Sequence, residues 1–413
     1  MALAESDTKP RLPIELIGLI IASLANLSQA EDNRLCHLQA CSLVSWAWND
    51  LCRPYIFYTL TIHRLDNTIR RLSFLHFKAP HLSKYIHELS IFPGSNVPKL
   101  PKWIPKCFRR LTNLHTMDVV GGDLDTSPTP SPMATTALLI KFVPYLRKLS
   151  LNSITFIDAS HLIDFLPSRT LEELRIVYTE DDFTDGYPQT NGAQSVVRFD
   201  ALRTLAVETA FPVLRYATPM ACPNLRSFAV QWNGRRRWKL PLWIPDSLSE
   251  LTVQVNLAHR IRGAPKLGTT IRPSVLRIVA VRCNKYLNAF RLIKACVGSL
   301  PFPGLVRELP MSIAIHDPKE NRAIFPQAWD YEVLSLCLQQ LYAHGTLGRA
   351  VLEINVRGMI PKGFSLDEIM ARELAKVNEG FAGLLATNVL YVDFDLTCWN
   401  DSGDKVSVHF SLP

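Results

Sequence analysis

The chain has 413 residues, of which 47% are hydrophobic and 20% charged. This length suits two or three ordinary domains or one elongated repeat array, and the composition excludes an intrinsically disordered chain. The net charge of +8 is spread along the sequence, whereas a nucleic-acid binder more often concentrates its basic residues on one face or helix. Nucleic acid is therefore not the expected partner.

The first segment with strong periodicity follows a polar stretch, residues 1–10, which we expect to be a flexible N-terminus. Pro13 indicates a helix start, because proline is tolerated in the first helical turn. Two shorter helical patterns follow, and the apolar positions of the three are Ile17, Ile20, Ile21, Leu24, Leu35, Leu38, Trp48 and Leu51. So small a unit cannot bury all this surface within itself, so some of it should face a partner.

Residues 11–54 resemble the F-box, the helical module that docks a protein onto the adaptor subunit of an SCF-type (cullin–RING) ubiquitin ligase. The resemblance lies in an opening Leu-Pro phrase with branched residues after it, a later Leu-Val-Ser-x-x-Trp phrase and a closing Leu-Cys-Arg-Pro, the last typical of fungal members. Two departures are the long polar connection before Arg34 and Trp46, where a basic residue often stands. The matching residues are Leu12, Pro13, Glu15, Ile17, Ile20, Leu43, Val44, Ser45 and Trp48.

The resemblance implies a partner, the ligase's adaptor subunit, and through it a cullin. It also implies which side chains bind the adaptor: Leu12, Pro13, Ile17, Ile20, Leu43, Val44 and Trp48. The alternative is an ordinary N-terminal helical cap whose leucines and tryptophans belong to the core.

Residues 55–413 carry a recurring phrase: an apolar residue, two residues, an apolar residue, one residue, and a third apolar residue. The copies are Ile86-Leu89-Ile91, Leu114-Met117-Val119, Leu146-Leu149-Leu151, Leu171-Leu174-Ile176, Leu202-Leu205-Val207, Leu225-Phe228-Val230, Leu248-Leu251-Val253 and a looser Leu276-Val279-Val281. Their spacing overlaps the leucine-rich repeat period of about 20–29 residues.

The phrase has a simple physical meaning. Its last two apolar residues lie two apart, and so on one face of a short strand. One such unit cannot cover its own core face, so neighbours must stack. We therefore expect an α/β protein: a three-helix F-box followed by an irregular leucine-rich-repeat-like solenoid with a curved, mainly parallel sheet. The Asn or Cys that usually ends the strand segment is largely absent, which leaves an ordinary α/β domain as the alternative.

From about residue 283 the repeats loosen, but helices and strands still alternate. Helices are expected over Asn284–Val297, over Trp329–His344, and from a capping box of Ser365 and Glu368. A strand is expected at Met311–Ile315. The final strands, Val389–Leu396 and Val406–Leu412, form a hairpin that closes the open edge of the sheet.

The most basic stretch follows the strand of the Leu225 copy and is a candidate target-binding loop. Arginines beside an aromatic ring suit a phosphate or an acidic peptide. A solvated charge run is the plainer interpretation. The stretch comprises Arg235, Arg236, Arg237, Trp238 and Lys239.

No catalytic, metal or cofactor motif is found, so a non-catalytic protein without cofactors is expected. The nine cysteines lack C-x-x-C spacing, and no secretory or membrane-spanning segment is evident. An intracellular location, in cytoplasm or nucleus, is the corresponding expectation.

Together these features predict the substrate-recognition subunit of an SCF-type ligase, in which the F-box docks on the adaptor and the repeats bind a target protein for ubiquitination. The alternatives are a leucine-rich-repeat scaffold without ligase association and a basic nucleic-acid-binding protein that uses Arg235–Lys239.

Overall fold

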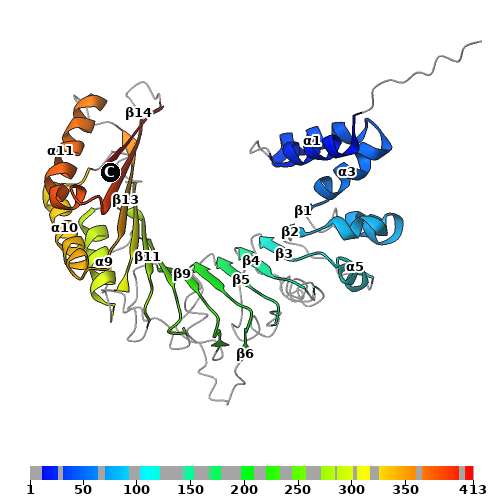
Figure 1. The fold of residues 1–413 in the computed structure, drawn as a ribbon, viewed down its shortest axis with the longest axis horizontal. Coiled ribbons are helices and arrows are strands. Elements are labelled where there is room, and N and C mark those ends of the chain that lie inside the picture. The colour runs from blue at the N-terminus through cyan, green and yellow to red at the C-terminus, as the bar shows by residue number, and fades with distance from the viewer. Residues whose placement is uncertain are drawn as a thin grey trace, which may run out of the picture. The chain divides into compact units, whose positions relative to one another are not determined.

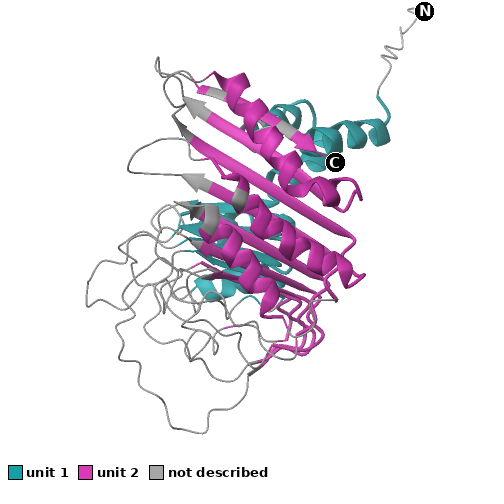
Figure 2. Cartoon of the chain, turned by 90° about the vertical axis from the view of Figure 1, so that its left-hand side faces the viewer, with its two compact units in different colours: residues 1–154 teal, residues 155–413 magenta. Residues whose placement is uncertain are grey.

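The structure is a computed structural model of the chain. It describes residues 12–26, 31–63, 70–92, 103–120, 143, 145–152, 166, 169–177, 197–208, 220–232, 244–256, 271–283, 286–300, 305–316, 325–359, 365–399 and 405–412. The chain divides into two compact units, Met1–Ile154 and Thr155–Pro413, which Figure 2 shows in different colours. Each unit is described by itself.

Unit 1 begins with three helices, α1 (Ile14–Asn26), α2 (Glu31–Ser42) and α3 (Trp46–Ile56), which we call the head. Pro13 directly precedes α1, as its role in helix initiation predicts. Ser45 is the N-cap of α3: its hydroxyl accepts a hydrogen bond from the Trp48 amide at 3.3 Å. This bond satisfies one of the amides that the first turn of a helix leaves without an internal partner.

Parallel strands follow the head in unit 1. They are β1 (Thr59–His63), β2 (Glu88–Phe92), β3 (Thr116–Val120) and β4 (Lys148–Asn152), each paired in parallel with the next. The connections include η1 (Phe74–Lys78), η2 (Pro80–Tyr85) and α5 (Ile104–Arg110). The repeat phrase explains the register, because Leu89 of β2 pairs with Met117 of β3, and Met117 with Leu149 of β4.

Unit 2 continues the same pattern, and its strands become longer from β9 onward. Its main-sheet strands, in spatial order, are β5 (Glu173–Val177), β7 (Thr204–Glu208), β9 (Ser227–Trp232), β10 (Glu250–Asn256), β11 (Val275–Cys283), β12 (Glu308–His316), β13 (Arg349–Met359), β14 (Leu390–Trp399) and β15 (Lys405–Leu412). A separate small sheet pairs β6 (Val197–Arg198) with β8 (Met220–Ala221). Only β15 runs antiparallel among the described pairs of the main sheet, and it forms the predicted closing hairpin with β14.

Helices cover one face of the unit 2 sheet from β11 onward. They are α9 (Tyr286–Gly298), α10 (Ala328–Ala343) and α11 (Leu366–Leu385), and they pack side by side against the sheet (Figures 1 and 2). The predicted capping box is present at the start of α11, where the Ser365 hydroxyl and Glu368 carboxylate each bond to the other's backbone amide. From β11 to β14, a helix lies between each strand and the next one along the chain.

The predicted repeat phrases describe the core well. The apolar residues of the first seven copies are buried, and the mainly parallel, leucine-rich-repeat-like sheet is confirmed. The eighth copy differs from the prediction, because Leu276 pairs with Leu251 and Ile278 with Val253. Leu276, Ile278 and Ala280 therefore face the core, and Val279 lies on the opposite face. A shift of one residue along a strand moves a side chain to the other side of the sheet.

Candidate docking surface on the N-terminal helices

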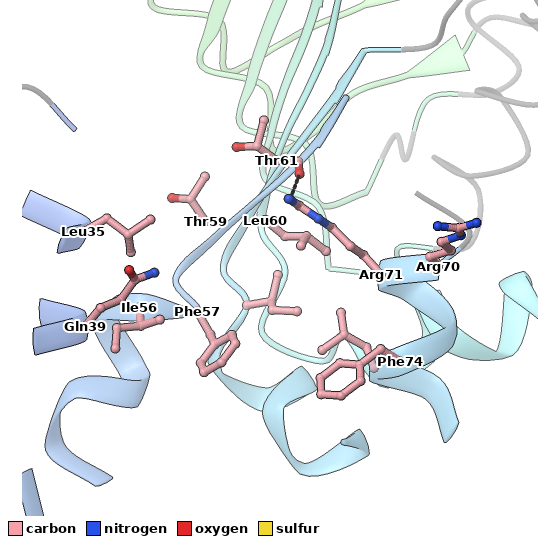
Figure 3. A pocket seen from close by; sticks show the side chains of 12 residues that line it. Leu35, Gln39, Ile56, Phe57, Thr59, Leu60, Thr61, Arg70, Arg71 and Phe74 are labelled. Carbon is pink, nitrogen blue, oxygen red and sulfur yellow. Dashed lines mark hydrogen bonds between the residues drawn. The ribbon is translucent and has the colours of Figure 1, made fainter. Parts of the chain in front are cut away.

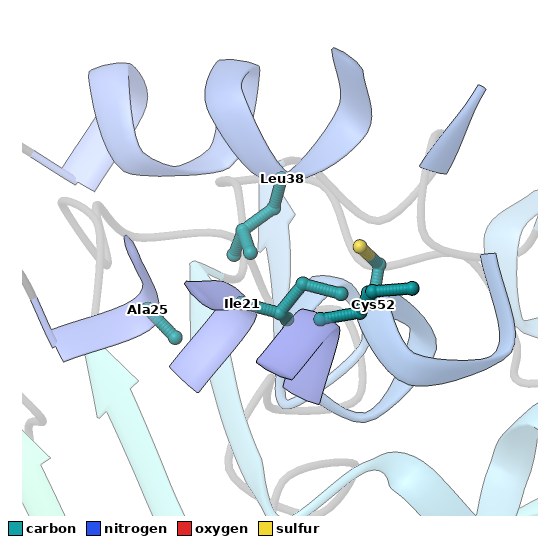
Figure 4. Packing of buried hydrophobic residues seen from close by; sticks show 5 residues of the cluster. Ile21, Ala25, Leu38 and Cys52 are labelled. Atoms are coloured by element: carbon teal, nitrogen blue, oxygen red, sulfur yellow. The ribbon is translucent and has the colours of Figure 1, made fainter. Parts of the chain in front are cut away.

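The head has a small core of its own (Figure 4). Ile21 and Cys52 are fully buried, and Ile17, Ala25 and Leu38 lie in the same cluster. Burial raises the pKa of the Cys52 thiol, and the nearby Cys41 acts in the same direction. Cys52 therefore serves as a small, uncharged core residue.

A second set of apolar side chains in the head points into solvent instead. Leu43 is 87% exposed, Trp46 80% and Leu19 64%. The exposed set, which we call the docking surface, consists of Leu12, Ile14, Leu16, Leu19, Ile20, Leu35, Leu43, Val44 and Trp46. Scattered single apolar residues on a surface need no explanation, but a group of this size on one small module is a candidate interaction site.

The residues predicted to bind the adaptor divide between these two sets. Leu12, Pro13, Ile20, Leu43 and Val44 are exposed, as docking requires. Ile17 is only 7% exposed and belongs to the core of the head, and Trp48 packs against that core and is half-buried. Both side chains therefore contribute to the packing of the head.

Sequence reasoning missed several members of the docking surface. In α1 it followed the stripe through Ile17 and Ile21, which faces inward. Leu16 and Leu19 lie on a second stripe of α1, which faces outward. Leu12, which the signature had already named, precedes the helix and is also exposed. Apolar residues on two faces of one helix indicate that one face is left uncovered, since the module to which the helix belongs can cover only the other.

The side chains that define the docking surface are all apolar. Charged residues described in the head include the exposed Glu15 and the pair of the exposed Asp50 with the half-buried Arg53, whose Oδ1 and Nη1 atoms are 2.8 Å apart. The Ser45 cap fixes the start of α3 just after Leu43 and Val44. The surface is therefore built for binding another apolar surface.

The sheet face of unit 2 that the helices leave uncovered is a second candidate surface, and it is polar. Glu353 of β13 lies opposite Asp393 of β14, and Asp395 follows on the same side. Ser411 of β15 donates a hydrogen bond to Asp393 Oδ1 at 2.6 Å. At the start of β13, the Arg349 guanidinium lies 5.2 Å from the centre of the Tyr391 ring. This face offers both charges and an aromatic ring to a ligand.

Two further features from the sequence are the basic stretch and the cysteines. The basic stretch Arg235–Lys239 lies outside the described residues. Of the cysteines in the described part, Cys36 is exposed and Cys41 half-buried, whereas Cys52, Cys107, Cys222, Cys296 and Cys337 are buried and free. Burial raises the pKa of the Cys107 thiol to about 11 and that of Cys222 to about 12.

Searches of the described residues for two other kinds of site gave negative results. No group of three or more His, Cys, Asp or Glu side chains there is arranged to hold a metal ion. Within the same residues, no helix combines the length and the hydropathy that a membrane crossing requires.

Comparison with known proteins gave a likeness to solved structures alone. No family model matches the chain, and no curated protein does. A similar solved structure is that of the leucine-rich repeat-containing protein LegL7 from Legionella pneumophila, with a TM-score of 0.40 and 11% identity. The match covers 84% of this chain and 92% of that one. The fold is leucine-rich-repeat-like. This follows from the stacked parallel strands and their shared register, and such a fold suits a protein-binding scaffold.

Proposed function

We propose that this protein is the substrate-recognition subunit of an SCF-type ubiquitin ligase. The head would dock on the adaptor subunit, and the repeats would bind a target protein. The observation that supports docking is the coincidence of two independent features. Four of the residues that resemble the F-box signature, Leu12, Pro13, Leu43 and Val44, are also exposed, on a head that has a buried apolar cluster of its own.

The solvent exposure of these residues has an energetic consequence. Covering an exposed leucine side chain removes apolar surface from water and contributes roughly 1.5–3 kcal/mol. A partner with an apolar groove would gain this contribution several times over along α1 and at the α2–α3 turn, as in helix-in-groove recognition. The ordinary helical cap that we considered as an alternative would instead place these leucines in its core.

The repeat region supports the other half of the proposal. Leucine-rich-repeat-like sheets present a broad face on which side chains from successive strands stand in rows. In unit 2 this face carries Glu353, Asp393 and Arg349, which suit a polar protein surface. The chain itself would perform no chemistry: it would raise the effective concentration of a target lysine near a ubiquitin-loaded enzyme held by other subunits.

Binding to the purified adaptor subunit tests the docking half. We expect Leu12→Asp with Leu43→Asp to weaken adaptor binding at least about a hundredfold, because two buried contacts of hot-spot size are lost. Isothermal titration calorimetry with the full chain measures this change. Both positions are exposed, so circular dichroism should show an unchanged fold.

Leu336→Asp is the matched control, because Leu336 is a half-exposed leucine on α10, outside the head. It should bind the adaptor like the unmodified chain. Equal affinity for the adaptor in all three proteins, or no binding by any of them, would contradict the docking assignment and favour a scaffold without ligase association.

A further inference from the structure

Unit 1 contains a cavity of about 480 Å³ beside the head. Its walls come from α2, from α3 and the residues just after it, from β1, and from the helical segment that begins at Arg70 and continues into η1 (Figure 3). The volume lies within the range of about 300–1,000 Å³ that small-molecule sites occupy. Four separate segments therefore line one partly open space of ligand size.

Most of the cavity wall is apolar. The apolar side chains that carry this argument are Leu35, Ile56, Phe57, Leu60 and Phe74. Ile56, Phe57 and Leu60 are half-buried, and Phe74 is 48% exposed, so the cavity is reachable from solvent. A lining of this kind favours an occupant with an apolar body, because it gives water few hydrogen-bond partners.

The charge of the lining has one sign. Arg70 and Arg71 line the cavity, and among the described residues no carboxylate does. The nearest acid with a described bond to the wall is Glu88 on β2, whose Oε2 accepts a hydrogen bond from Thr59 Oγ1 at 3.1 Å. An anion in the cavity would therefore meet guanidinium groups and no acid of the described lining.

Arg71 is held in position at one side of this space. Its Nη1 donates to the Thr61 carbonyl oxygen at 2.8 Å, and Figure 3 shows the side chain reaching along the cavity toward β1. A guanidinium has five N–H donors in a fixed plane, and this bond uses one of them. Such a positioned fork suits a carboxylate, with which arginine forms charge-assisted hydrogen bonds.

We propose that this cavity binds a small organic acid with an apolar body, with the carboxylate at Arg71 and the body against Leu60, Phe57 and Phe74. A bound acid would contact both the head and the first strand, so it would also stabilise unit 1 against unfolding. This site shares Leu35 with the docking surface, but its other lining residues lie outside that surface. Its existence does not depend on the proposed ligase function.

Three compounds that differ in one terminal group test the proposal: 4-phenylbutyrate, 4-phenylbutanol and 4-phenylbutylamine. Their binding to the full chain is measured by ligand-observed NMR and by thermal unfolding. We expect the acid to bind, the alcohol to bind about tenfold more weakly and the amine not to bind, because only the acid gains a charge-assisted bond. Equal binding of acid and alcohol, or no binding of the acid, would overturn the proposal.

Substitutions in the cavity wall test whether the acid binds at this site. Arg71→Met should weaken binding of the acid about tenfold, and Leu60→Trp should block it by filling the space. Arg110→Met is the matched control, since Arg110 is also an exposed arginine whose Nη1 donates to a backbone carbonyl, that of His76 at 3.1 Å, but it does not line the cavity. Circular dichroism checks that each variant is folded. Unchanged binding in Arg71→Met, or an equal loss in Arg110→Met, would refute the assignment.

Discussion

At the scale of single residues, the most unusual side chain outside the head is Glu373 on α11. It has no solvent exposure, and its Oε1 accepts a hydrogen bond from Lys376 Nζ at 2.7 Å. Arg372 Nε lies 3.4 Å from the same oxygen, and Oε2 has no hydrogen-bond partner within the described structure. Burial raises the pKa of Glu373 above its ordinary value of 4.5, although Lys376 and Arg372 act against the change.

The buried pair predicts a large cost when one partner is removed. We expect Lys376→Met to lower the free energy of unfolding by about 3 kcal/mol at neutral pH, because the Glu373 carboxylate then stays buried with weaker compensation. Urea unfolding measures the loss. The double variant Glu373→Leu with Lys376→Met should recover most of it, since it buries no charge. Arg198→Met removes an exposed partner of Asp200 and should cost at most about 1 kcal/mol.

The pH dependence of the Lys376→Met variant follows from the same raised pKa. When the folded pKa of a carboxyl group lies above its unfolded value, the native state binds more protons than the unfolded state between the two values. Stability is then highest below 4.5 and falls as pH rises through the folded pKa. The deficit of Lys376→Met should therefore shrink when unfolding is measured in acid. A deficit that is constant with pH would show that Lys376 acts through packing alone.

At the scale of elements, α10 and α11 approach each other closely at a glycine. A Cβ added to Gly380 would lie 2.7 Å from Tyr331 Cβ, whereas one added to Gly383 would meet no atom within 4 Å. Both glycines are in α11, so the two positions differ in their packing and share the same helix. Gly380 is thus required by its neighbour on α10, and Gly383 is not.

This contrast predicts opposite effects of the same substitution. Gly380→Ala should destabilise the protein by about 1–3 kcal/mol, because the added methyl forces the helices apart. Gly383→Ala should stabilise it by about 0.5–1 kcal/mol through the higher helix propensity of alanine. Thermal or urea unfolding of the two variants measures both signs. If both variants were stabilised, the described packing of α10 on α11 would be incorrect.

The elements also show how far sequence reasoning reaches. The repeat phrase predicted strands such as β3 and β10 because burial of alternate residues is a local pattern. It misplaced the strand face of β11, where Leu276, Ile278, Val279 and Val281 are all apolar and periodicity cannot distinguish the two faces. Strand β13 was not predicted. In the head, both stripes of α1 are apolar, so the sequence predicted an uncovered surface but assigned Ile17 to it instead of Leu16 and Leu19.

At the scale of the whole molecule, the two ends of the repeat series have different surroundings. Strand β15 closes one end by pairing antiparallel with β14. At the other end, Arg71 bonds to the Thr61 carbonyl of β1, and the proposed acid site lies beside this strand. Capping of terminal repeats is what keeps a solenoid soluble, because an uncovered terminal repeat exposes its core and its strand edge.

The exposed docking surface gives the free chain a property of its own. Contiguous apolar surface on an isolated protein promotes association, because the same burial that drives partner binding is available between copies. We expect the unmodified chain to associate in solution as its concentration rises, and Leu12→Asp with Leu43→Asp to remain monomeric. Light scattering coupled to size-exclusion chromatography measures the mass.

The control for this last prediction is again Leu336→Asp, which should associate like the unmodified chain because Leu336 lies outside the docking surface. Addition of the purified adaptor should suppress association of the unmodified chain if the adaptor covers the same residues. Association that persists in Leu12→Asp with Leu43→Asp would show that another surface causes it. Association that is lost in this variant but is unaffected by the adaptor would confirm that the docking surface drives association and would contradict the adaptor as its partner.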